Sequence, residues 1–348
     1  MAVQYKLVAE EIGRNIAARR YGDTLPPLRE LSEQFQVSLH TVQRALRLLS
    51  QRSLVAADST RGIRIIQRPQ STIIGVLCNF RKGNSNDPVV QSLRKQIEAD
   101  GYEAIFLDVP EKVCNEPDGA FWRYGWADGY ISLYGTSDTN IDLCLKSFNL
   151  PVITANHAAR KAELPCVDFD HTMLLKQLAT GLYERGYRKI ALSFTICSKL
   201  ISDEVNAAFA EFCQQHQLEL PRHWVTSAAA EDIKIQREVR IAQQFEQILG
   251  DKDQRPEAVI CFHHGLKFAA ALAAQYDLAL GQDLVIAGTG RNDVAGNGVL
   301  PVELSYCDLA EGLWSQLKKQ IDDPQKKYGT TLLPPPEIDW SKLAAKTN

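Results

Sequence analysis

The sequence predicts an α/β protein: an N-terminal winged helix-turn-helix followed by a larger, two-lobed domain of doubly wound parallel sheets. Three observations support this prediction. Two amphipathic segments are joined by a tight turn within residues 28–49, a two-strand pattern follows within residues 54–66, and a strand–helix alternation begins at Ile73. With 348 residues, of which 45% are hydrophobic, the chain is long and apolar enough for two or three buried cores.

The first predicted element is an amphipathic helix over residues 3–20. Four apolar side chains of this helix are expected to face inward: Val3, Leu7, Ile12 and Ile16. Gly22 and Asp23 then turn the chain, and residues 25–27 lead it into the next helix.

Residues 28–49 have the pattern of a helix-turn-helix. Apolar residues recur at helical spacing in both segments: Leu28, Leu31, Phe35, Val42, Ala45, Leu46 and Leu49. The hydroxyl of Ser38 is expected to cap the second helix. The opposite face of that helix is polar, and Thr41 lies near its N-terminus, where a recognition helix meets base edges of DNA. Four further residues form this polar face: His40, Gln43, Arg44 and Arg47.

A two-stranded wing is predicted after the helix pair, because the strand-like segments 54–55 and 63–66 flank a turn at residues 58–62. Arg61 and Gly62 lie at the expected tip, and Arg64 follows. Glycine lets the backbone approach a phosphate closely, and an arginine at this place is suited to the minor groove or the DNA backbone.

We expect three segments along the chain: a winged-helix domain over residues 1–67, a polar linker over residues 68–72, and the larger domain over residues 73–348. The linker contains Pro69, and the apolar run that begins at Ile73 is typical of a strand buried on both faces. Repeated strand–helix alternation then favours parallel sheets with helices on both faces. The region is large for one sheet, so two lobes with a cleft between them are expected.

The net charge of −3 conceals an asymmetry. Residues 1–70 hold eleven Lys and Arg against six Asp and Glu, a net charge of +5, and the remaining residues carry −8. A basic head on an acidic body is typical of a polyanion contact confined to the head, and with the recognition-helix pattern it indicates duplex DNA. Charge alone leaves open a solvated surface with chance clustering.

The eight cysteines are scattered and form no C-x-x-C pair. We therefore expect buried free thiols in a reducing compartment, no zinc or other metal site, and no cofactor. The sequence shows no signal-peptide segment and no run of eighteen apolar residues, so we expect a cytoplasmic protein without membrane contact, associated with the nucleoid through DNA.

Four stretches of the head occur in a defined order and spacing: VAEEI at 8–12, LPPLREL at 25–31, VSLHTVQRAL at 37–46 and TRGIRI at 60–65. On these stretches, residues 1–66 resemble the GntR family of winged-helix repressors. The resemblance implies DNA contacts by Arg29, Thr41 and Gly62, whereas Leu39 and Gln43 stand where the family has arginines. The complete candidate DNA-binding set is Arg29, Ser38, Leu39, His40, Thr41, Gln43, Arg44, Arg47, Arg61, Gly62 and Arg64.

The larger domain contains a second ordered set of stretches: IIGVL at 73–77, ADGYISL at 127–133, PVITANH at 151–157, RGYRKIALSF at 185–194, RPEAVICFHH at 255–264 and DLVIAGTG at 283–290. On these it resembles the LacI-type, periplasmic-binding-protein-like effector domain. The resemblance implies two lobes, a small molecule in the cleft and a homodimer. It also implies a bacterial transcription regulator, a repressor of the carbohydrate-responsive kind, that binds a double-stranded DNA operator and is not an enzyme.

Polar and aromatic residues at the expected strand ends form the candidate effector pocket. They are Asn79, Phe80, Tyr134, Asn156, His157, Asp170, His263, His264, Arg291 and Asp308. His263 and His264 stand where the resembled family has an Asn-Asp pair that binds sugar hydroxyls, and Gly290 or Arg291 stands where it has an aspartate. A phosphorylated sugar is therefore expected as an effector beside a neutral sugar.

Two other functions stay open. The altered pocket is also compatible with a ligand-blind regulator whose effector domain only dimerises. An enzyme with a DNA-binding head would need a catalytic constellation, and the sequence shows neither a nucleophile elbow nor a Cys–His pair. The aromatic segment 121–126 is either a sugar-stacking platform or a part of the core.

Overall fold

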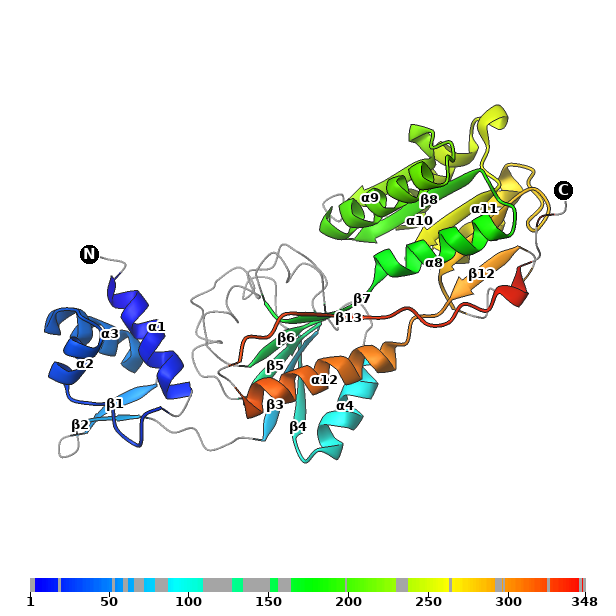
Figure 1. Ribbon diagram of the computed structural model, residues 1–348. Coiled ribbons are helices and arrows are strands. Elements are labelled where there is room, and N and C mark those ends of the chain that lie inside the picture. The colour runs from blue at the N-terminus through cyan, green and yellow to red at the C-terminus, as the bar shows by residue number, and fades with distance from the viewer. Residues whose placement is uncertain are drawn as a thin grey trace. The chain divides into compact units, whose positions relative to one another are not determined.

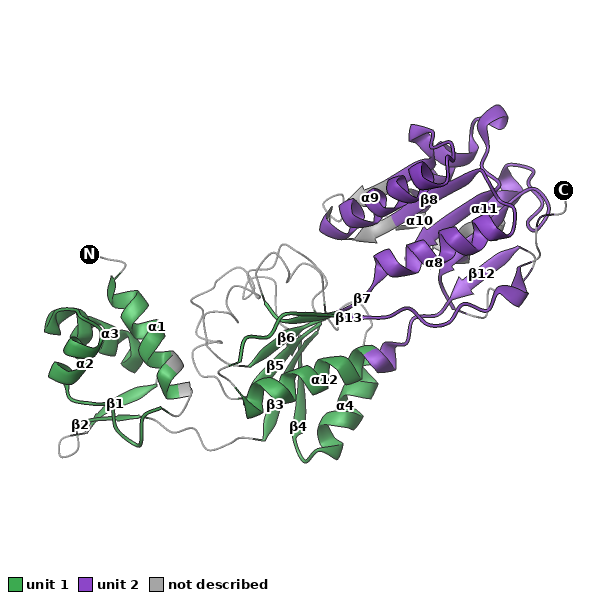
Figure 2. Cartoon of the chain, viewed as in Figure 1, with its two compact units in different colours: residues 1–167, 309–331 green, residues 168–308, 332–348 purple. Residues whose placement is uncertain are grey.

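The computed structural model describes residues 4–17, 20–51, 54–58, 62–65, 72–78, 87–108, 127–133, 151–155, 164–197, 199–229, 237–262, 265–291, 296, 298–323, 326–343 and 346. The chain divides into two compact units, one of residues 1–167 and 309–331, the other of residues 168–308 and 332–348 (Figure 2). It passes from one unit to the other three times, so neither unit is a single continuous segment.

The N-terminal head contains a helix-turn-helix and a wing (Figure 1). Its elements are α1 (Gln4–Ala17), α2 (Leu28–Gln34), α3 (Leu39–Gln51), β1 (Val55–Asp58) and β2 (Gly62–Ile65). The two strands pair antiparallel, with Val55 opposite Ile65. In the turn between α2 and α3, Gln36 has a φ of 50°, and the Ser32 hydroxyl donates a hydrogen bond to the Val37 carbonyl at 2.5 Å. The predicted winged helix-turn-helix is therefore confirmed.

One continuous core holds the head together. Its buried residues come from all five elements and the segment before α2: Val8, Ala9, Ile12, Leu25, Leu31, Val42, Ala45, Leu46, Leu49, Val55 and Ile65. The amphipathic pattern of the sequence over α2 and α3 thus describes the packing of these helices. Leu25 also donates a backbone hydrogen bond to the carbonyl of Ile63 at 2.9 Å, which ties the entry to α2 to the wing.

The expected inward position of Leu7 is wrong. Leu7 is 57% exposed, whereas Val8, Ala9 and Ile12 are buried. Successive residues of a helix are about 100° apart around its axis, so a stripe centred on Val8 and Ile12 leaves Leu7 at the solvent side. Helix α1 also ends at Ala17, before the predicted residue 20.

The first unit contains a six-stranded sheet with the order β13-β7-β6-β5-β3-β4. Its strands are β3 (Ile73–Cys78), β4 (Glu103–Asp108), β5 (Gly129–Ser132), β6 (Val152–Thr154), β7 (Cys166–Phe169) and β13 (Thr330–Leu333), the last two reaching across the unit boundary. The pairs from β4 through β7 are parallel. Every residue of β5 and β6 is buried, as expected for central strands of a sheet that is covered on both faces.

Helices α4 (Pro88–Ala99) and α12 (Tyr306–Asp322) accompany the same sheet. Helix α12, like β7 and β13, crosses the unit boundary. Asp100, which ends α4, joins them: its Oδ2 accepts hydrogen bonds from Trp314 Nε1 at 2.9 Å and from Lys318 Nζ at 2.6 Å. The hydrogen bonds from Lys318 and Trp314 lower the pKa of the Asp100 carboxyl. This polar contact fixes the C-terminal end of α4 against α12.

The second unit contains a five-stranded parallel sheet with the order β12-β11-β10-β8-β9. Its strands are β8 (Ile190–Cys197), β9 (Val225–Ala229), β10 (Ala258–Phe262), β11 (Val285–Thr289) and β12 (Val299–Val302). Its helices are α8 (His171–Glu184), α9 (Lys199–Gln215), α10 (Arg237–Leu249) and α11 (Gly265–Gln275). Three short 3₁₀ segments, Arg222–Trp224, Lys252–Gln254 and Trp340–Lys342, complete the described part of the unit.

Each face of this sheet carries its own core. Along β10, Ile260 and Phe262 pack with residues of α8 and α9, whereas Val259 and Cys261 pack with residues of α10 and α11. Alternation within one strand therefore supplies two cores, which is the arrangement of a doubly wound α/β sheet. Among the described residues, no helix is long and apolar enough to span a membrane.

The C-terminal segment is fastened to α8 by Trp340. A Cβ atom added at Gly181 of α8 would overlap the Trp340 ring, and the guanidinium carbon of Arg185 lies 4.3 Å from that ring's centroid. Leu343 is buried in the core between α8, α9 and the sheet. Glycine is therefore required at position 181 for steric reasons.

We expect Gly181→Ala to destabilise the protein by about 1–3 kcal/mol, because the added methyl group must displace the Trp340 ring. The sign of the change in the free energy of unfolding is informative, because Gly→Ala within a helix ordinarily stabilises a protein by about 0.5–1 kcal/mol. Urea unfolding followed by tryptophan fluorescence measures the change. Thr180→Ala, at the exposed neighbouring position of α8, is the matched control, and an unchanged or raised midpoint for Gly181→Ala would contradict the packing.

Candidate DNA-binding surface and effector region

Helix α3 presents one buried and one exposed face. Val42, Ala45, Leu46 and Leu49 are buried in the core of the head. The opposite face carries the predicted contact residues: Leu39, His40, Gln43, Arg44 and Arg47 are exposed, and Thr41 is half-buried. Because the buried stripe fixes the rotation of the helix, this polar and basic face is the one available to a partner.

The N-terminus of α3 is held by Ser38. Its Oγ accepts a hydrogen bond from the Thr41 backbone N–H at 3.2 Å and lies 2.9 Å from the Thr41 hydroxyl. The predicted capping role of Ser38 is therefore confirmed. The cap satisfies a backbone donor that would otherwise lack an intrahelical partner, and it keeps the first turn of α3 in place.

Arg44 makes a contact that the sequence did not indicate. Its guanidinium carbon lies 4.2 Å from the ring centroid of Tyr5 in α1. A cation–π contact of this kind at an exposed site contributes about 0.5–1 kcal/mol. Residue 5 and residue 44 meet only because α1 packs against α3, and no local pattern in either segment predicts that pairing.

The other predicted DNA contacts lie around α3. Arg29 is exposed in the first turn of α2, and Arg64 is exposed in β2, where it pairs with Ala56 and bridges to Thr24. Gly62 begins β2 with a φ of 83°, a backbone conformation that other residues rarely adopt. Arg61 lies outside the described residues.

The predicted effector residues follow the carboxyl ends of parallel strands. The structure describes three of them: Asp170 after β7, Arg291 after β11 and Asp308 after β12. The others lie outside the described residues: Asn79, Phe80, Tyr134, Asn156, His157, His263 and His264. Ligand sites of open α/β sheets lie at this edge.

Asp170 has a structural contact of its own. Its Oδ1 accepts a hydrogen bond from the Met173 backbone N–H at 2.8 Å and caps α8, while its backbone N–H donates to the Leu333 carbonyl at 2.9 Å. Arg291 and Asp308 are both exposed. Arg291 follows β11 by two residues, and Asp308 lies in the first turn of α12, the helix that follows β12.

Aromatic side chains contact one another beside Asp170. The ring of Phe169 lies 6.4 Å from His171 and 6.2 Å from Tyr306, and the ring of His171 lies 5.9 Å from Phe262. Tyr306 is 45% exposed. The sequence placed Asp170 and Asp308 here but did not indicate these rings, because they come from the ends of separate strands and helices.

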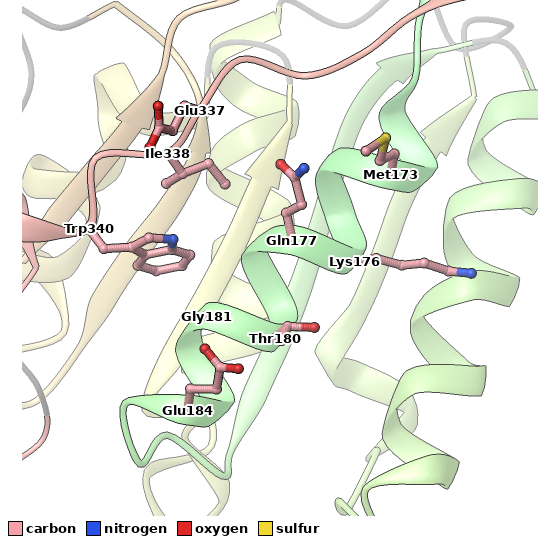
Figure 3. A pocket seen from close by; sticks show the side chains of 9 residues that line it. All are labelled: Met173, Lys176, Gln177, Thr180, Gly181, Glu184, Glu337, Ile338 and Trp340. Atoms are coloured by element: carbon pink, nitrogen blue, oxygen red, sulfur yellow. The ribbon is translucent and has the colours of Figure 1, made fainter.

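A separate depression lies on the second unit, between α8 and the C-terminal segment (Figure 3). Its volume is about 510 Å³, and it is lined by Met173, Lys176, Gln177, Thr180, Gly181, Glu184, Glu337, Ile338 and Trp340. None of the predicted effector residues lines it. Its helical wall consists largely of ordinary exposed side chains of α8.

The described cysteines are free: Cys78, Cys166, Cys213 and Cys261 are buried, and Cys307 is exposed. Burial raises the pKa of the Cys213 thiol to about 11 and also raises the pKa of Cys261, so both stay protonated and unreactive at neutral pH. In the part of the chain that the structure describes, no three His, Cys, Asp or Glu residues lie together as metal ligands.

The fold defines a class of DNA-binding transcription regulators. The chain begins with a winged helix-turn-helix that exposes a basic recognition face, and two α/β regions with parallel strands follow it. Residues 4–65 match the model of the gntR family of bacterial regulatory proteins, and residues 179–340 match the periplasmic binding protein-like domain. The chain therefore combines a gntR-type domain of bacterial regulatory proteins with a periplasmic-binding-protein-like domain.

The chain is also similar to three named proteins. The arabinose metabolism transcriptional repressor of Geobacillus stearothermophilus is 23% identical over 288 residues, which cover 76% of this chain and 75% of the relative. A putative ribose operon repressor from Burkholderia thailandensis has a TM-score of 0.60 at 17% identity and covers 76% of this chain and 97% of its own. A complex of the transcriptional regulator CelR with cellobiose has a TM-score of 0.62 at 14% identity. The match covers 89% of this chain and 97% of the CelR chain. These structural likenesses show the fold.

We expect Ser38→Ala to destabilise the head by about 1 kcal/mol, because the Thr41 N–H loses its acceptor. Native-state hydrogen exchange of the α3 amides measures the local effect as an exchange rate that rises about five-fold. Ser38→Thr keeps a capping hydroxyl and is the control. Equal protection in the Ala and Thr variants would show that the cap does not stabilise α3.

Proposed function

We propose that the protein represses transcription by binding a specific DNA operator, and that a small molecule in the effector domain controls this binding. The exposed face of α3 is the observation that carries the proposal, because its rotation is fixed by the buried stripe on the other side. The names of the relatives, which refer to arabinose, ribose and cellobiose, support a sugar or sugar derivative as the effector.

In this proposal, α3 enters the major groove and the wing contacts the DNA backbone or the minor groove. Thr41, Gln43, Arg44 and Arg47 meet base edges and phosphates, with Arg29 at the groove wall and Arg64 beside the wing tip. The net charge of +5 in residues 1–70 favours the approach to DNA, and the −8 on the remaining residues keeps the effector domain away from it.

The proposed effector site comprises the residues at the carboxyl ends of the strands: Asn79, Phe80, Tyr134, Asn156, His157, Asp170, His263, His264, Arg291 and Asp308. Asp308 and Arg291 support hydroxyl and anion recognition respectively, and Tyr306 adds an exposed ring on which a sugar can stack. Because arginine binds phosphate in a bidentate manner, we propose a phosphorylated sugar as the preferred ligand.

The division into a head of residues 1–67, a linker of residues 68–72 and an effector domain of residues 73–348 gives this proposal its mechanism. A homodimer formed through the effector domains would place two heads on half-sites about 34–36 Å apart. A ligand that changes the spacing of the heads then changes operator affinity through linkage. In this proposal the protein acts by binding and not by catalytic turnover, and it works in the cytoplasm at the nucleoid. Analytical sedimentation at micromolar protein concentration tests whether it is a dimer.

The alternative proposal is a ligand-blind regulator whose effector domain only dimerises. It is favoured by Arg291 and the two histidines, which depart from the pattern of neutral-sugar sites. The two proposals differ in whether any small molecule alters the stability of the protein or its affinity for DNA.

We expect Arg44→Glu, Arg47→Glu and Arg61→Glu each to weaken binding to a duplex selected by the wild-type chain. Each removes a positive charge from the DNA face, and the slope of log K against log salt flattens by about 0.9 for every phosphate that the variant no longer neutralises. Fluorescence anisotropy at several salt concentrations measures both quantities. Lys252→Glu, an exposed charge reversal in the second unit, is the control. Affinity that stays at the control value in all three head variants would sink the DNA-contact assignment.

We expect a sugar or sugar phosphate to raise the melting temperature and to change DNA affinity. Binding at a hundred-fold excess over Kd stabilises the folded state by about 2.7 kcal/mol. A thermal-shift screen should include arabinose, ribose, cellobiose and their phosphorylated forms, followed by titration calorimetry of the best binder. Arg291→Gln should remove a preference for the phosphorylated ligand. Asp308→Asn, the corresponding change at the acidic residue, is tested beside it. No stabilisation by any compound would favour the ligand-blind regulator, and a preference for a neutral sugar would contradict the phosphorylated ligand.

A further inference from the structure

Tyr5 and Arg44 meet at the solvent rim of the head. Tyr5 is half-buried and lies one helical turn before Val8 and Ala9, which are buried between α1 and α3. Arg44 is exposed and directly precedes the buried Ala45. The guanidinium carbon of Arg44 lies 4.2 Å from the centroid of the Tyr5 ring. The contact therefore lies where the packed interface of α1 and α3 opens onto the polar face of α3.

This stacking leaves the hydrogen-bonding edge of the guanidinium available. The contact of the guanidinium carbon with a ring face does not occupy the five N–H donors of the group, and these donors are the ones that bind phosphate or guanine. Among the described residues, no carboxylate forms an ion pair with Arg44. The ring thus orients the group without using its donors.

Orientation before binding matters for a long side chain. Free arginine samples many rotamers, and association must restrict them, so a side chain already held in place loses less freedom when DNA arrives. Arg47, the next basic residue on the same face of α3, is exposed and has no ring contact with a described residue. The exposed face of α3 therefore carries one arginine with a ring contact and one without, which provides an internal comparison.

We propose that Tyr5 of α1 is a positioning residue for DNA recognition: its ring holds the Arg44 guanidinium in the orientation used at the DNA surface. This inference rests on the proposed contact between Arg44 and DNA. It extends the recognition surface to the first helix, whose side chain at position 5 acts through Arg44 rather than on the nucleic acid.

The test is a double-mutant cycle on the full-length chain, with a labelled duplex selected from a randomised library by the wild-type protein. We expect Tyr5→Leu, which keeps apolar volume but removes the ring, to weaken binding about two-fold to five-fold, the fold-change that corresponds to about 0.5–1 kcal/mol. Tyr5→Phe keeps the ring and should stay close to wild type. Melting curves confirm that each variant is folded at the assay temperature.

Measuring Tyr5→Leu in two variant backgrounds shows whether the loss of DNA affinity passes through Arg44. In Arg44→Ala, adding Tyr5→Leu should cause no further loss, whereas in Arg47→Ala it should cause the same two-fold to five-fold loss as in wild type. A purely structural role of Tyr5 would weaken binding equally in both backgrounds, and that result would overturn the proposal. Wild-type affinity of Arg44→Ala would instead remove the DNA contact on which the proposal rests, and the two failures are therefore distinguishable.

Discussion

The apolar stripe of α3 is the constraint on which the DNA-binding surface depends. Val42, Ala45, Leu46 and Leu49 can be buried together in only one rotation of the helix, and that rotation turns Gln43, Arg44 and Arg47 to solvent. Burial of side chains such as these contributes about 1.5–3 kcal/mol each for the larger ones, several times the contribution of an exposed polar contact. The hydrophobic core of the head thus decides which residues can touch a partner, and the polar residues only decide which partner.

The effector domain obtains a comparable result from parallel sheets. In a parallel sheet all strands end at one edge, so residues that are distant in sequence are collected at that edge. Arg291 and Asp308 follow β11 and β12 of the five-stranded sheet, whereas Asp170 follows β7 of the six-stranded sheet. None of them contributes to the cores, apart from the cap that Asp170 makes on α8. Their identity is therefore free to change while the alternation of buried residues in strands such as β10 preserves the fold.

The periodic features of the fold were predictable, and the long-range ones were not. The helical stripe of α3, the cap by Ser38 and the two-faced strands follow from local spacing, and the structure confirms them. The prediction for Leu7 was wrong because the buried stripe of α1 can move by one residue around the helix and still contain most of the same apolar positions. The contact between Tyr5 and Arg44 and that between Gly181 and Trp340 depend on how separate segments pack, which neither local pattern contains.

The three passages of the chain between the units have a consequence for synthesis. The sheet of the first unit needs β13, and its helix α12 is also supplied late in the sequence, while the second unit needs Trp340 and Leu343 to complete its packing. Ribosomes add residues in order, at about 5–20 per second, so the head can fold early whereas both units must wait for the last part of the chain. A nascent chain stalled before residue 309 therefore carries a finished DNA-binding head on an unfinished body.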